Sequence, residues 1–77
     1  MVEMAKYRLS VVVEKDADGY TATCIDLQGC HAQGDTYEEA IANVEDAIRL
    51  HVEDRVARGE TVPSASMVSL TTVEISV

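Results

Sequence analysis

The chain has 77 residues, a length that suits one small domain, and we expect residues 1–77 to form it. Fourteen acidic against six basic residues give a formal charge of -8, which disfavours direct binding of nucleic acid because phosphate is repelled. No apolar run approaches the roughly 18 residues of a membrane span, and the N-terminal residues lack a signal-peptide pattern. Two cysteines without an export signal predict reduced thiols and a cytoplasmic protein.

Period-two alternation marks two strands at the start of the chain. Residues 5–14 alternate and include three consecutive valines, which predicts the first strand. The polar stretch 15–19 ends in glycine and predicts a hairpin loop, followed by a second strand at 20–25 that pairs antiparallel with the first. One face of each strand is expected to be apolar, formed by Tyr7, Leu9, Val11 and Val13 in the first and by Tyr20, Ala22 and Cys24 in the second.

A turn and a short strand follow. Residues 26–29 end in glycine and predict a turn, and residues 30–34 are long enough for a brief third strand. Its alternation places Cys30 and Ala32 on one face and His31 and Gln33 on the other. The sequence therefore predicts a three-stranded meander.

The period then becomes helical from Thr36 to about Arg58. Thr36 and Glu39 form a capping box, and Gly59 is suited to end the helix. At 3.6 residues per turn one side of this helix is apolar, which predicts that it covers one face of the sheet. That side comprises Tyr37, Ala40, Ile41, Val44, Ala47, Ile48, Val52 and the stem of Arg55.

The C-terminal part predicts a loop at 60–66 and a last strand at 67–77. The apolar residues of this strand change parity between Leu70 and Val73. A bulge near residues 71–72 would return them to one face; otherwise the two halves contact different neighbours, one of them in another subunit. Both alternatives stay open. The order strand, strand, strand, helix, strand predicts an α+β fold, an antiparallel sheet with one amphipathic helix packed on one face.

Three motifs carry a family resemblance. They are Gly19-Tyr20-x-Ala22, Asp26-Leu27-x-Gly29-Cys30 and Gln33-Gly34-Asp35-Thr36-x-Glu38-Glu39-Ala40. Over about residues 7–58 the chain resembles the HicB antitoxin family. The resemblance implies a partial ribonuclease-H-like β-β-β-α-β fold and neutralisation of HicA, a small basic RNA-cleaving toxin. Typical members continue into a DNA-binding segment, for which no room follows Gly59, so we expect a short, stand-alone member.

The outer face of the helix is the candidate partner-binding site. It carries an acidic strip interrupted by one arginine and bordered by one leucine, formed by Glu38, Glu45, Asp46, Arg49, Leu50 and Glu53. Such a strip would complement the RNA-binding surface of a basic toxin; the alternative is an ordinary solvated helix face. The small core and the apolar last strand also predict self-association, as a dimer or a dimer-based tetramer.

No catalytic, cofactor-binding or metal-binding residue is predicted. The spacing of Cys24, Cys30 and His31 matches no common zinc pattern, and the cysteines alternate inward as small apolar residues do. The aspartates that a metal-dependent nuclease would use, Asp16, Asp18, Asp26 and Asp35, lie in turns or beside the helix cap. His51 lies at the edge of the apolar helix side, where a half-buried histidine is expected.

The sequence thus favours a binding protein that neutralises a HicA-like toxin by direct contact. The alternative function is a regulatory or scaffold domain of the same fold that binds another partner. A metal-dependent nuclease is the least favoured function.

Overall fold

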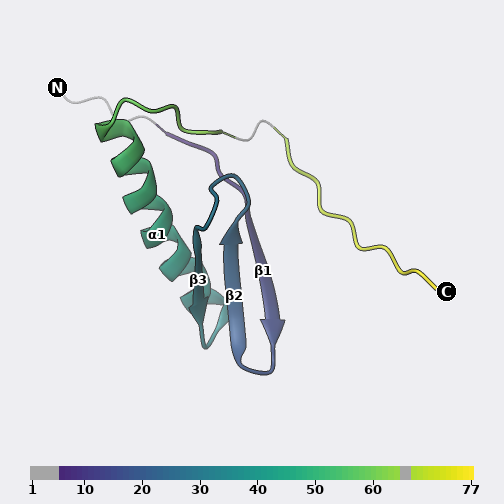
Figure 1. Cartoon of the computed structure of the whole chain (residues 1–77). Helices are drawn as coiled ribbons and strands as arrows, with labels where there is room; N and C mark the ends of the chain where they lie inside the picture. The colour runs from purple at the N-terminus through teal and green to yellow at the C-terminus, as the bar shows by residue number, and fades with distance from the viewer. Residues whose placement is uncertain (1–5, 65–66) are drawn as a thin grey trace.

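The computed structural model describes residues 6–64 and 67–77. Three strands form one antiparallel sheet in the order β1-β2-β3, and a single helix packs on one face of it (Figure 1). The elements are β1 (Val11–Asp16), β2 (Gly19–Cys24), β3 (His31–Gly34) and α1 (Tyr37–Ala57). The predicted α+β meander followed by a covering helix is confirmed.

The β1–β2 hairpin is tighter than predicted. Asp16 pairs with Gly19, so two residues form the turn and β1 continues into the stretch 15–19 that was expected to be loop. The Asp16 Oδ1 atom accepts from the amide of Asp18 at 2.8 Å, and Gly19 has a φ of 130° that disfavours other residues. The expected strand start was also wrong, because residues 6–10 precede β1, although the amide of Ile25 donates to the Ser10 carbonyl at 3.0 Å.

The turn between β2 and β3 forms as predicted. The amide of Cys30 donates to the Leu27 carbonyl at 3.2 Å, and Gly29 supplies the positive φ of 77° at this turn. Cys30 returns the chain to the sheet, since its carbonyl accepts from the amide of Cys24 at 2.9 Å. Cys30 is buried and Ala32 half-buried, whereas His31 and Gln33 are exposed, which confirms the expected alternation.

Both ends of α1 are closed by the residues that the sequence indicated. The Thr36 hydroxyl accepts from the amide of Glu39 at 3.1 Å. At the other end Gly59 has a φ of 72°, its amide donates to the carbonyl of Val56, and the amide of Glu60 donates to that of Arg55. These two bonds form a Schellman motif, which needs a residue able to adopt a positive φ.

The core between sheet and helix consists of two clusters, in which all residues but Leu27 are small or medium-sized. Ala22, Ala40 and Val44 form the first, and Cys24, Leu27 and Cys30 form the second. Ile48 contacts both clusters and joins them. Small side chains let the helix lie close to the strands, so the core is closely packed without tryptophan or phenylalanine.

One residue of the predicted apolar helix face lies outside this core. Tyr37 is 51% exposed, because it is the first residue of α1 and the helix begins where β3 ends. The other apolar positions on that side are buried or half-buried.

The predicted fourth strand does not join the sheet. In the described residues after Ser64, no strand is formed, and residues 67–77 are exposed throughout. Figure 1 shows this segment as an extended trace that leads away from the sheet and the helix. Neither the bulge near residues 71–72 nor the contact of the two halves with different neighbours is tested here, because residues 67–77 have no partner strand.

Candidate partner-binding surfaces

The predicted acidic strip lies on the outer face of α1, and every one of its side chains is exposed. Arg49 Nη1 contacts Asp46 Oδ1 at 3.2 Å. Both partners are mostly in water, where such a pair contributes little to stability. The strip therefore presents carboxylates that the fold leaves available to a partner.

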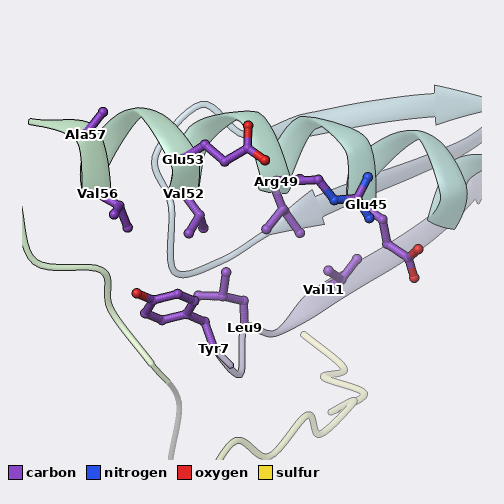
Figure 2. A pocket seen from close by; sticks show the side chains of 10 residues that line it. Tyr7, Leu9, Val11, Glu45, Arg49, Val52, Glu53, Val56 and Ala57 are labelled. Atoms are coloured by element: carbon purple, nitrogen blue, oxygen red, sulfur yellow. The ribbon is translucent and has the colours of Figure 1, made fainter. Parts of the chain in front are cut away.

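A groove opens beside the strip, between α1 and the chain that leads into β1. Its floor is apolar: Tyr7 and Leu9 project toward Val52 and Val56 of the helix (Figure 2). Tyr7 is 41% exposed and Val56 is 51% exposed, so this apolar surface is only partly covered. The full lining comprises Tyr7, Leu9, Val11, Glu45, Ile48, Arg49, Val52, Glu53, Val56 and Ala57.

The strip and the groove adjoin along the helix. Glu45, Arg49 and Glu53 of the predicted strip also line the groove and give it a charged rim, whereas the remaining strip residues lie outside it. Those remaining residues are Glu38, Asp46 and Leu50. Of these, Leu50 is 68% exposed, as single apolar residues on a protein surface commonly are. The strip thus divides into a part shared with the groove and a part facing water alone.

Sequence reasoning missed the groove because it treated Tyr7 and Leu9 only as members of the core face. A signal was present at the end of the helix. Val56 follows Val52 by four residues, so the apolar side of α1 continues beyond the last strand that could cover it.

The two cysteines lie side by side in the core and are free thiols. Burial, and to a smaller degree the neighbouring Cys24, raise the pKa of the Cys30 thiol above its ordinary value. A thiol held in its protonated form is a poor nucleophile and a poor metal ligand. His31 lies on the opposite face of β3, exposed, so the structure does not bring it to the cysteines.

Two of the four aspartates considered for a nuclease, Asp16 and Asp26, accept hydrogen bonds at opposite ends of the sheet. Asp26 Oδ2 accepts from the amide of Ser10 at 2.7 Å, at the end of the sheet away from the β1–β2 turn that Asp16 closes. Among residues 6–64 and 67–77 there is no group of three or more metal-binding side chains. The carboxylates are therefore accounted for by turns, by the strand end and by the solvated surface.

His51 is half-buried, as expected at the edge of the apolar face. Its Nε2 atom accepts from Arg55 Nε at 3.1 Å, and Arg55 Nη1 donates to the carbonyl of Thr61 at 3.0 Å. This chain of bonds ties the loop after α1 to the last turns of the helix. We assign His51 a structural role.

No helix in the described part of the chain is long and apolar enough to cross a membrane.

Taken together, the fold and its surfaces define a small α+β domain whose exposed features are an acidic helix face and an apolar groove. The chain belongs to the HicB-like antitoxin family of bacterial toxin–antitoxin systems, whose family model matches residues 9–75.

Three relatives match a large part of the chain. The chain is 46% identical to a UPF0150 protein of Synechocystis sp. over 63 residues, which cover 80% of each chain. It is 46% identical to a UPF0150 protein of Helicobacter pylori over 60% of this chain and 64% of that protein. It is 37% identical to a UPF0150 protein of Thermoplasma acidophilum over 73% of this chain and 83% of that protein. No solved structure matches the chain significantly.

Proposed function

We propose that the protein is an antitoxin that neutralises a small basic, HicA-like RNA-cleaving toxin by direct contact. The observation that carries the proposal is family membership combined with a formal charge of -8 and an exposed acidic helix face. Binding suffices for this role, and no catalytic step is assigned to the chain. The strip offers carboxylates to cationic side chains with which the toxin would otherwise bind RNA phosphates.

The proposal includes the setting in which the protein works. We place it in the cytoplasm, where such a toxin would meet RNA, without direct binding of nucleic acid by this chain. Residues 1–77 would act as one HicB-like domain, as a dimer or a dimer-based tetramer. The partial ribonuclease-H-like β-β-β-α-β fold includes a fourth strand after the helix, and residues 67–77 are the candidate segment for it.

The test is co-purification with two matched charge-reversed variants. The tagged chain is expected to retain a small basic protein whose RNA cleavage it suppresses. Glu38→Lys with Asp46→Lys changes the strip outside the groove, and Glu14→Lys with Asp18→Lys makes the same charge change on exposed residues of the hairpin. We expect the first pair to weaken binding strongly at low salt and the second to weaken it little. Equal effects of the two pairs would show that net charge alone, not the strip, governs binding.

A further inference from the structure

The outer edge of β1 is a free hydrogen-bonding edge. In an antiparallel ladder, residues that bond the neighbouring strand alternate with residues whose backbone groups point away. The bond from the Ile25 amide to the Ser10 carbonyl places Ser10 among the residues directed toward β2. By the observed register, Val11 and Val13 then direct their amides and carbonyls to the outer edge. Such an edge is a template for another strand.

The opposite edge of the sheet is not equivalent. β3 has four residues and lies under α1, and its outward-facing carbonyl at Gln33 accepts from Asn43 Nδ2 at 2.8 Å. A helix side chain therefore occupies part of that edge. β1, with six residues, is the longer and more open site for strand addition.

The groove lies directly beside the β1 edge. The helix extends its apolar side past the start of β1, so Val52 and Val56 overhang Tyr7 and Leu9, which lead into that strand (Figure 2). Neighbouring strands lie about 4.8 Å apart, and a helix with its side chains is about 10 Å wide. One additional strand beside β1 would therefore come to lie under this overhang and exclude water from Tyr7, Leu9 and Val56.

The chain itself contains a segment suited to that place. Residues 67–77 include no proline or glycine, carry the single charge of Glu74, and contain six large apolar residues that are 49–123% exposed. An apolar segment of this kind, left in water, is prone to pair with another strand. Eleven residues span about 36 Å when extended, enough to follow all of β1 and the residues that precede it. The family model extends to residue 75, so most of this segment belongs to the shared domain.

The segment does not fold back onto its own sheet. Ser64 Oγ accepts from the amide of Arg8 at 3.3 Å, which places the chain beside the start of β1, yet residues 67–77 then lead away from the sheet (Figure 1). A second copy, related by a two-fold axis, would receive this segment and return its own. In this symmetric exchange, the outer edge of β1 and the groove would be covered in both copies.

We propose that residues 67–77 of a second copy add as a strand to the outer edge of β1 and fill the groove between β1 and α1. The segment places Val73, Ile75 and Val77 against the groove, while Thr72, Glu74 and Ser76 face away. Each copy thereby supplies the strand that the sheet of the other copy lacks. The apolar side chains change from one face of the segment to the other between Leu70 and Val73, where the segment passes from one copy to the other. This inference rests on the dimer included in the proposed function and names the contact that would form it; it requires no toxin.

The test is the mass of the full chain in solution, measured by light scattering at micromolar concentration. Wild type is expected at about twice the 8.4 kDa of one chain. Val73→Asp with Ile75→Asp is expected to halve that mass. Thr72→Asp with Ser76→Asp adds the same charges on the other face of the same segment and is expected to leave the dimer intact.

A second pair of variants examines the receiving surface. Val56→Asp lies in the groove and is expected to give monomers. Leu50→Asp lies on an exposed part of α1 outside the groove and is expected to leave dimers. Circular dichroism checks that each variant retains its helix. A monomeric wild type overturns the proposal, including one whose own segment pairs with β1. The proposal is also overturned if the dimer persists both in Val56→Asp and in the variant Val73→Asp with Ile75→Asp.

Discussion

Gly34 and Ala40 lie in backbone contact, with the end of β3 against the first turn of α1. A Cβ atom at Gly34 would lie 2.9 Å from the Cα of Ala40 and 2.8 Å from the carbonyl carbon of Glu39. Real Cβ atoms essentially never approach backbone so closely. The contact sets how closely the first turn of α1 approaches the end of β3.

Gly34→Ala should therefore destabilise the protein by about 1–3 kcal/mol, the usual cost of forcing extra volume into a packed site. Urea denaturation measures the change. Gln33→Ala is the control on the same strand, because the Gln33 side chain is exposed and only its carbonyl is bonded. A Gly34→Ala variant as stable as Gln33→Ala would mean that the helix does not rest on this contact.

Ile48→Asp should unfold the domain. Ile48 joins the two core clusters, and an unpaired carboxylate there costs several kcal/mol, on the order of the whole stability of a small domain. Thermal melting followed by circular dichroism is the measurement. Leu50→Asp, two residues away on the exposed side, should melt within a few degrees of wild type. Similar melting of both variants would contradict the observed helix face.

Asp26→Ala should lower the free energy of unfolding by about 1–3 kcal/mol, because it leaves the half-buried amide of Ser10 without its acceptor. Asp26→Asn keeps an oxygen at this position and should cost less. The matched control is Asp18→Ala, an exposed side chain in the hairpin turn. If Asp26→Ala and Asp18→Ala have the same stability, the bond to Ser10 is not significant.

The Cys30 thiol should make the protein less stable at alkaline pH. Its pKa is raised in the fold above the ordinary 9.0, so the unfolded chain loses this proton first. The contribution is complete below about pH 9 and is lost as the pH rises through the folded pKa. Denaturation at about pH 8 and about pH 10 should show a smaller loss in Cys30→Ala than in wild type. An identical loss in both proteins would assign the alkaline effect to other groups.

The elements that depend on neighbours in sequence could be predicted. Strand alternation identified the inward positions of Ala22 and Cys24, and the Thr36 cap and Gly59 marked the helix ends, because these signals act within a few residues. The hairpin boundary was missed because the bond from the Asp18 amide to the Asp16 carboxylate lets β1 run two residues further. Tyr37 was misplaced because helical periodicity does not reveal where the sheet ends.

Of the two candidate surfaces, the acidic strip could be predicted from the sequence and the groove could not. Charge and periodicity placed Glu38, Asp46 and Leu50 on an exposed face, as the structure has them. The groove arises from Tyr7 and Val56, which are 49 positions apart and are brought together only by packing. The strand expected at 67–77 has the right composition, but pairing depends on a partner edge that local sequence does not specify.

The central claim, that this chain neutralises a toxin by binding it, is tested most directly by an RNA-cleavage titration. The small basic protein that co-purifies with the chain is separated from it in denaturant, refolded and given RNA with increasing amounts of the chain. We predict that cleavage falls to background near one equivalent, and that Glu38→Lys with Asp46→Lys requires a clear excess. Cleavage that continues unchanged at a large molar excess of the wild-type chain would contradict the account.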